Sequence, residues 1–244
     1  MTRIILAIDT ATITASAALW RDGVVLATAA QDSSGHSSEL LPMIDALCRS
    51  QGILPTQLTA VAIGLGPGSF TGLRIGMATA KGVAFAAQLE MWGVSSLAAV
   101  ALQMADALPE AARATTLLVP ILDARRNEVY LGGYRSVAPD RVAAVIAETV
   151  LAPTAVAEYI EGARGALAQV VLAGDGLTVF AEVLGALAFL KLPMQTPCAG
   201  AVARLAASGE HLNMLDHGTP VYIRPSEAEV NYPNGVPGAI RNVV

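Results

Sequence analysis

Residues 58–89 of this chain read LTAVAIGLGPGSFTGLRIGMATAKGVAFAAQL. Residues 58–65 form an apolar run of strand length, the glycine-rich residues 66–72 have the composition of a turn, and residues 71–89 have the length of a helix. A buried strand that passes through a glycine-rich loop into a long helix is the repeating unit of α/β folds. This stretch therefore predicts an α/β protein.

The residues on either side of this unit predict the rest of a first lobe. Residues 4–8 are a continuous apolar run, and residues 14–20 and 24–30 flank a turn at Asp22 and Gly23, so a three-stranded meander is expected. In residues 36–50 the apolar side chains recur on one helical face. A short strand at 92–94 and an alanine-rich helix at 96–108 follow, and we place the first lobe at 1–108.

The same order of elements begins again after Pro109. Residues 117–122 form an apolar strand that ends at Asp123, and residues 129–134 form a second strand, much as Asp9 ends the first strand of the chain. This similarity indicates an internal duplication. We therefore expect a second lobe at 109–217, a late strand at 219–224 within a segment, 218–230, that completes the first lobe, and a loose tail at 231–244. Mixed sheets are expected in both lobes.

The composition is unusually apolar and poor in charge. Hydrophobic residues make up 54% of the 244 residues and charged residues 14%, whereas roughly 25% charged is usual. The longest uncharged stretch, residues 50–73, is interrupted by glycine and proline and cannot form one membrane-spanning helix. A partner protein is therefore expected to cover part of the apolar surface.

Charge and cysteine content narrow the function further. A net charge of −5 and a pI near 5.2 argue against nucleic-acid binding by this chain alone, because phosphate contacts need clustered Lys and Arg. Cys48 and Cys198 are far apart and lack metal-ligand spacing, and the first apolar run is too short for a secretory signal. These features predict a cytoplasmic protein that reaches RNA only through a partner.

The glycine-rich loop has two interpretations. A glycine-rich turn that enters a helix presents backbone N–H groups and the positive end of the helix dipole, which is how many proteins hold phosphate. The spacing fits neither a Walker loop nor a dinucleotide fingerprint, however, and it favours a tight turn capped by Ser69 or Thr71. The candidate anion-binding residues are Gly66, Gly68, Ser69, Thr71, Gly72 and Arg74.

The helix at 71–89 has one face that is almost free of side-chain bulk. Gly72, Gly76, Ala80 and Ala84 recur every four residues, and each glycine within a helix costs roughly 1 kcal/mol relative to alanine. Close approach of another element would offset this cost. That element is either a helix of a partner or the chain's own sheet or helix, and the spacing leaves both alternatives open.

Signals for metal binding or catalysis are weak. A helical metal site usually presents two histidines four residues apart, and Leu40 stands four residues after His36. Asp9 and Asp123 could hold Mg²⁺ between the lobes, but Thr10 follows Asp9 where a phosphate-binding glycine is expected. We therefore predict no metal ligand, no catalytic residue and a degenerate nucleotide cleft at Asp9, Thr10 and Asp123.

Several of these strings together resemble one family. The chain is similar to the TsaB family, a subunit of the bacterial machinery that forms N6-threonylcarbamoyladenosine (t6A) beside the tRNA anticodon. The resemblance runs in order from the first strand to about residue 225. It is carried by residues 5–10 (ILAIDT), 36–42 (HSSELLP), 66–76 (GPGSFTGLRIG), 123–125 with 129–130, and 222–224 (YIR).

The resemblance implies a two-lobed, actin-like (ribonuclease H-like) fold with mixed central sheets and a non-catalytic role. It implies a heterodimer with the catalytic TsaD subunit, TsaE as a third partner, and ATP or ADP, Mg and Fe or Zn on those partners rather than tightly on this chain. The same surface could pair two copies of this chain when the partner is missing. The expected interface comprises His36, Glu39, Leu40, Met43, Leu47, Leu73, Gly76, Met77, Ala80 and Ala84.

Two other functions stay open. One is an ATP-dependent small-molecule kinase or ATPase of the same superfamily that uses Asp9, Asp123 and the loop at Gly66. The other is a metallopeptidase, which would need bound metal. Under the scaffold hypothesis, Gly76→Leu or Ala80→Glu should abolish complex formation without unfolding the chain.

Overall fold

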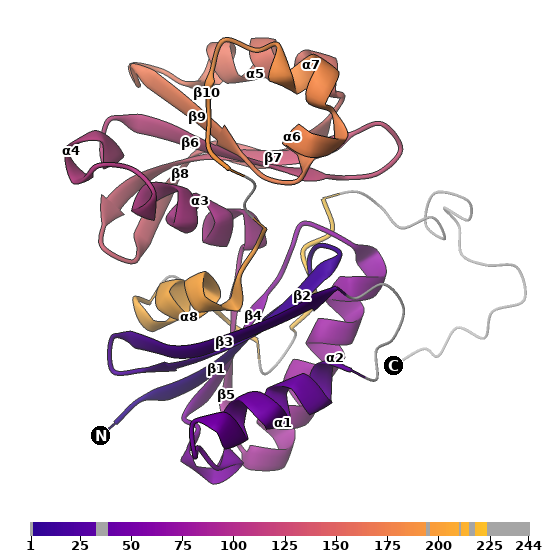
Figure 1. The fold of residues 1–244 in the computed structure, drawn as a ribbon, viewed down its shortest axis with the longest axis vertical. Coiled ribbons are helices and arrows are strands. Elements are labelled where there is room, and N and C mark those ends of the chain that lie inside the picture. Colours follow the sequence, from indigo (N-terminus) through magenta and orange to yellow (C-terminus); the bar gives the residue numbers. More distant parts are fainter. Residues whose placement is uncertain (1, 33–38, 194–195, 210, 215–217, 224–244) are drawn as a thin grey trace, which may run out of the picture.

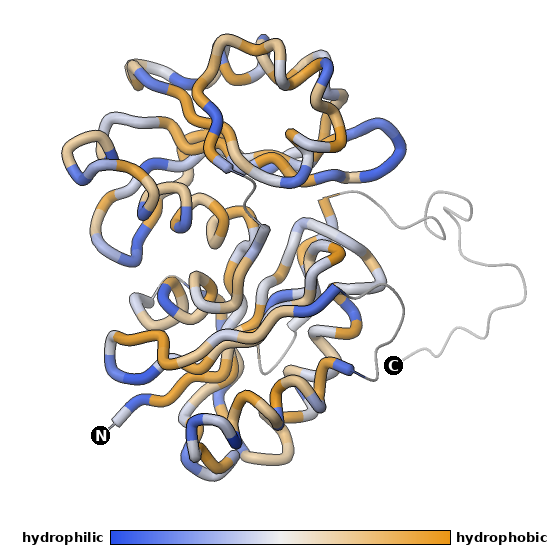
Figure 2. Tube along the Cα trace, in the orientation of Figure 1, coloured by the Kyte–Doolittle hydropathy of each residue, from blue (hydrophilic) through white to orange (hydrophobic). Residues whose placement is uncertain are grey.

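A computed structural model describes residues 2–32, 39–193, 196–209, 211–214 and 218–223, in two lobes that each contain one sheet (Figure 1). The expectations for His36, Arg224 and residues 231–244 lie outside these ranges. Strongly hydrophobic positions lie on the strands of the two sheets and on the helices that cover them, and together they form the cores of the lobes (Figure 2).

The first sheet has the strand order β11-β5-β4-β1-β2-β3. The first three strands along the chain, β1, β2 and β3, form the expected meander, in which β1 pairs antiparallel with β2 from Ile4↔Arg21 to Asp9↔Ser16. β4 and β5 extend the sheet in parallel on the other side of β1. The strands are β1 (Ile4–Asp9), β2 (Thr14–Arg21), β3 (Val24–Asp32), β4 (Ala60–Gly64), β5 (Glu90–Val94) and β11 (Leu212–Asn213).

The second sheet repeats this arrangement. Its order, β10-β9-β6-β7-β8, again places an antiparallel meander beside two parallel strands. The duplication indicated by the sequence is thus visible in the topology, with Asp9 and Asp123 at equivalent ends of β1 and β6. The strands are β6 (Thr116–Asp123), β7 (Val129–Ala138), β8 (Arg141–Leu151), β9 (Gln169–Ala173) and β10 (Leu190–Lys191).

Helices cover both faces of the first sheet. α1 (Leu40–Ser50) and α2 (Phe70–Ala87) lie side by side on one face, and α8 (Ala199–Ala207) lies on the other (Figure 1). α3 (Ser96–Asp106) packs against both α8 and the second sheet, so it sits between the lobes. No helix within the described ranges combines the length and the apolar character needed to cross a membrane.

Short helices complete the second lobe. They are α4 (Glu110–Arg113), the 3₁₀ turn η2 (Pro153–Ala155), α5 (Val156–Ala163), α6 (Gly176–Val179) and α7 (Ala181–Gly185), and a further 3₁₀ turn, η1 (Pro55–Gln57), lies in the first lobe.

The structure differs from the expected lobe boundaries near the end of the chain. α8 and β11 fall within residues 109–217 but pack on the first sheet, because α8 is apolar and buries Val202 and Leu205 between that sheet and α3. The late strand expected at 219–224 is not a strand where it is described. Instead, the Val221 N–H donates to the Leu65 carbonyl at 2.9 Å, which still returns the chain to the first lobe.

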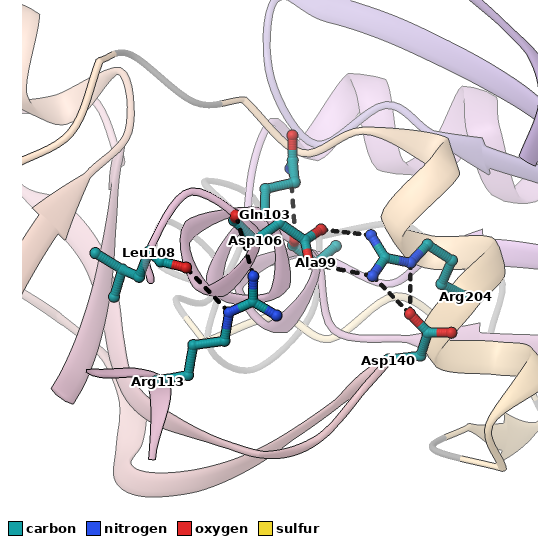
Figure 3. A network of polar contacts seen from close by, with 7 residues as sticks. All are labelled: Ala99, Gln103, Asp106, Leu108, Arg113, Asp140 and Arg204. Atoms are coloured by element: carbon teal, nitrogen blue, oxygen red, sulfur yellow. Dashed lines mark hydrogen bonds and ion pairs between the residues drawn. The ribbon is translucent and has the colours of Figure 1, made fainter. Parts of the chain in front are cut away.

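Arg204 of α8 links the two lobes. Its guanidinium donates to Asp106 Oδ2 at 2.5 Å, at the end of α3, and to Asp140 Oδ1 at 2.6 Å, in the turn between β7 and β8 (Figure 3). Arg113 secures the same end of α3 by donating to the carbonyls of Leu108 and Asp106. The Arg204 side chain is 25% exposed, so water screens these ion pairs only partly.

Replacing Arg204 with methionine should lower the free energy of unfolding by about 2 kcal/mol, because it leaves two neighbouring carboxylates without their shared cation. Arg49→Met is the matched control. Arg49 pairs with Asp45 at 3.0 Å on the exposed face of α1, with side chains 80% and 57% exposed, and its loss should cost less than about 0.5 kcal/mol. Urea unfolding of the two variants measures both values, and equal losses would contradict the assigned link.

Candidate functional site

A cleft of about 730 Å³ opens between the lobes. The first lobe contributes the segment after β1 and the start of α2, and the second lobe contributes the β6–β7 turn and the start of α6. These turns occupy equivalent places in the duplicated sheets, which is why they meet across the cleft. Of the predicted site residues, the cleft is lined by Gly68, Ser69, Thr71, Arg74 and Asp123.

The start of α2 adopts the capped turn that the spacing favoured. Ser69 Oγ accepts a hydrogen bond from the Gly72 N–H at 3.2 Å, and so Ser69 rather than Thr71 is the N-cap. The Ser69 N–H donates to the Ala11 carbonyl at 2.6 Å. The Gly66 N–H also donates to Ser96 Oγ at 3.1 Å, so three of the loop's N–H groups are engaged within the chain. Anion binding by this loop stays a prediction.

The small residues of α2 face the chain's own first strand. A Cβ added to Gly72 would lie 2.2 Å from the Thr10 carbonyl oxygen, and one added to Gly76 would lie 2.2 Å from Thr10 Oγ1. Ala80 and Ala84 are also buried. Of the two alternatives left open by the spacing, the chain's own sheet is the element that approaches this face.

Asp9 does not face the cleft. Its carboxylate is fully buried at the end of β1, where Oδ2 accepts from Ser96 Oγ at 2.7 Å and Oδ1 accepts from the Ala11 N–H at 2.9 Å. Gly64 leaves the space for it, because a Cβ there would lie 1.8 Å from Asp9 Oδ2. The expectation that Asp9, Thr10 and Asp123 share one cleft is therefore wrong for Asp9 and Thr10, which are both buried.

Burial makes Asp9 a pH-sensitive group. Desolvation raises its pKa from 3.8 to about 6, against the hydrogen bonds from Ala11 and Ser96, which lower it. The folded state thus holds this proton more tightly than the unfolded chain does. The resulting stabilisation is fully present below about pH 4 and is lost as the pH rises through about 6, a change of about 3 kcal/mol.

Asp9→Asn should remove this pH dependence. The unmodified chain should lose about 3 kcal/mol of unfolding free energy between pH 4 and pH 7 that the variant does not lose, because the amide does not ionise. Denaturant unfolding across this range measures the difference. Asp45→Asn, which changes a carboxylate whose side chain is 57% exposed, should show no comparable trend. If the difference in unfolding free energy between Asp9→Asn and the unmodified chain did not change with pH, the assigned role of burial would be contradicted.

On the second-lobe side, the cleft wall is an acidic pair held by the β6–β7 turn. The Asp123 N–H donates to Asp175 Oδ1 at 3.0 Å, and Asp123 Oδ2 pairs with Arg125 Nη1 at 3.1 Å. Arg125, Arg126 and Asn127 all have positive φ, between 53° and 62°, which is uncommon for residues other than glycine. Burial raises the pKa of Asp175.

The sequence interpretation missed Asp175 and Arg126, which both line the cleft. Residues 174–176 (GDG) form the turn between β9 and α6. The internal duplication could have identified them, because this turn is the second lobe's counterpart of the loop at Gly66. On the opposite wall, Arg74 lies 3.8 Å over the Phe70 ring, and Phe70 packs on Tyr222 with 5.0 Å between ring centroids.

The predicted partner-interface residues fall into an exposed group and a buried group. Glu39 is exposed and Met43 is partly exposed, whereas the remaining described members are buried in the chain's own core: Leu40, Leu47, Leu73, Gly76, Met77, Ala80 and Ala84. These seven cannot form an outer docking face, so the interface expected from the sequence is wrong for them. The physical reason is that their helical face packs on β1, β2 and β4.

The opposite side of the same helices carries a different apolar surface. On α2, Ala78, Gly82 and Phe85 lie on one helical face that is exposed, and on α1 the large exposed apolar residue is Leu41. Phe85 is 88% exposed and Leu41 56% exposed. We call these four residues the outer α1–α2 surface. Nothing lies within 4 Å of a Cβ built on Gly82, so another helix could approach it closely.

Comparison with known proteins identifies first the class and then the family. The two-lobed fold is actin-like: an activator of 2-hydroxyisocaproyl-CoA dehydratase from Clostridium difficile superposes with a TM-score of 0.50 at 11% identity, over 85% of this chain and 95% of that one. The family described as "TsaD: tRNA N6-adenosine threonylcarbamoyltransferase" matches residues 14–235.

Two relatives of higher sequence identity identify the family. The Escherichia coli tRNA threonylcarbamoyladenosine biosynthesis protein TsaB is 35% identical over 231 residues, which are 92% of this chain and 96% of the relative. The solved structure of YeaZ from Pseudomonas aeruginosa is 30% identical with a TM-score of 0.74, and the match covers 90% of this chain and 99% of that one. The chain belongs to the TsaB family.

Proposed function

We propose that this chain takes part in forming t6A beside the tRNA anticodon, as an accessory subunit that binds and activates a TsaD-like catalytic subunit. The observation that carries the proposal is the outer α1–α2 surface, in which Phe85 is 88% exposed although it is a large aromatic side chain. Exposed aromatic residues beside small ones are typical of protein interfaces, where they supply most of the binding energy.

The geometry of the cleft supports a non-catalytic role. In this chain the Asp9 carboxylate is turned into the core toward Ser96, and the Ala11 carbonyl is occupied by the Ser69 N–H. The segment after β1 thus packs on the start of α2, and the contact engages the Ala11 carbonyl within the chain. Gly68 permits this packing, because a Cβ there would lie 2.1 Å from the Ala11 oxygen.

ATP or ADP, Mg and Fe or Zn bind to the partner subunits, a TsaE-like ATPase joins the complex, and tRNA contacts this chain only within it. The outer α1–α2 surface can also pair two copies of this chain when the partner is absent. The site of action is the cytoplasm.

Reconstitution tests the function. Purified TsaD-like and TsaE-like proteins from the same organism, with tRNA and the other pathway components, are assayed for t6A by mass spectrometry with and without this chain. We expect t6A only when the chain is present. Equal t6A formation without it would overturn the proposal. Titration of the isolated chain with Mg-ATP by calorimetry should give no micromolar binding, whereas the kinase alternative requires it.

A further inference from the structure

A second pocket lies between the lobes, on the face of the first sheet opposite α1 and α2. Its volume is about 390 Å³, at the small end of the range for ligand sites. Val94 is the last residue of β5 in the first sheet, Leu205 comes from α8, and Val142 comes from β8, so its walls are apolar and both lobes contribute to them. The function proposed above assigns no role to it.

The polar part of this pocket is a three-residue cluster around one carboxylate. Glu148 Oε1 accepts hydrogen bonds from Tyr134 Oη at 2.5 Å and from Ser95 Oγ. Ser95 is fixed because it is also the N-cap of α3, accepting from the Ala98 N–H at 3.1 Å. Tyr134 is only 4% exposed. The two hydroxyl groups therefore hold the Glu148 carboxylate in a defined position at the pocket.

Gly132 of β7 leaves room for this cluster. A Cβ at this position would lie 3.1 Å from Tyr134 Cε2 and 3.2 Å from Glu148 Cγ, closer than most real Cβ contacts. The local sequence thus places a glycine where a side chain would press on both members. Burial, followed by the charge of Glu148, raises the pKa of Tyr134 well above 10, so the phenol keeps its proton and remains a donor to the carboxylate.

Within the described part of the chain, no Lys, Arg or His side chain forms an ion pair with Glu148. A carboxylate beside apolar walls attracts a group that brings a positive charge and an apolar stem together. An anion would be repelled, and a neutral alcohol would gain only the apolar contacts. We propose that this pocket binds a small organic cation, an ammonium or guanidinium group on a short aliphatic stem, with Glu148 as its counter-ion.

Ligand titration of the ¹⁵N-labelled full chain, followed by NMR, tests this inference independently of the proposed function. The probes are n-butylamine and agmatine, with n-butanol and butyrate as neutral and anionic controls of similar size. We expect saturable shifts for the two cations at amides around Ser95 and Glu148, with at least about tenfold weaker binding of the controls. Equal binding of n-butanol, or no saturable shift with either cation, would overturn the proposal.

Variants and blocked amino acids complete the test. Glu148→Gln should weaken n-butylamine binding about tenfold, whereas Glu182→Gln, which removes an exposed carboxylate from α7, should leave it unchanged. Retained affinity in Glu148→Gln would overturn the proposal, and if this variant does not fold, the probe series in the unmodified chain decides. If N-acetyl-lysine-N-methylamide binds as tightly as n-butylamine, the natural cation is a basic side chain of a partner protein. If only free amines bind, the natural cation is a small amine.

Discussion

Gly76→Leu is expected to destabilise this protein by about 3 kcal/mol or more, a large share of the roughly 5–15 kcal/mol that stabilises a folded protein. The first added carbon would already lie 2.2 Å from Thr10 Oγ1, and Ile63 Cδ1 lies 3.3 Å away. Thr10 is buried and cannot move out to solvent. Either α2 must separate from β1 or the side chain must adopt a strained rotamer, and both cost packing energy.

The same substitution six residues later on α2 is the control. A Cβ on Gly82 meets no atom within 4 Å, so Gly82→Leu should leave packing intact and gain up to about 1 kcal/mol from helix propensity. Urea unfolding followed by circular dichroism compares the two variants. If both changed stability in the same direction and by the same amount, the assignment of Gly76 to the core contact would be wrong. The contact with Thr10 thus contradicts the expectation from the sequence that Gly76→Leu spares folding.

Phe85→Glu is expected to weaken the complex with a TsaD-like subunit at least about a hundredfold while leaving the fold intact. Truncating a central aromatic side chain at an interface often costs 2 kcal/mol or more, and burying an unpaired carboxylate adds to that loss. In the free chain Phe85 is 88% exposed, so its replacement should change the free energy of unfolding by no more than about 0.5 kcal/mol. Calorimetric titration with the partner and thermal unfolding give the two values.

Val137→Glu provides the control for this prediction. Val137 is an exposed apolar residue of β7 in the second lobe, 42% exposed and away from the outer α1–α2 surface, so the added charge should not affect the complex. Should Phe85→Glu bind the partner as tightly as Val137→Glu does, the outer α1–α2 surface would not be the docking site. Full t6A formation with both variants would then require another contact surface.

Much of the fold could be predicted because each signal was local. The apolar run of β1, the turn at Asp22 and Gly23, and the capped glycine loop before α2 each depend on a few neighbouring residues. The repeated strand pattern ending at Asp9 and Asp123 predicted the duplication that the two sheets display. β8 and α8 were not predicted; β8 carries a mixed pattern at a sheet edge, and α8 joins the first lobe only through contacts distant in sequence.

The sequence by itself determined the α/β class, the duplicated lobes, the family and the apolar excess, because strand patterns, turns and motif strings are encoded in consecutive residues. The tertiary structure alone decided which face of α2 is free, since a stripe of small residues fits a partner helix and the chain's own β1 equally well. It also decided that Asp9 points toward Ser96 rather than into the cleft. Both outcomes depend on which element packs against a side chain, and spacing along the chain does not specify that.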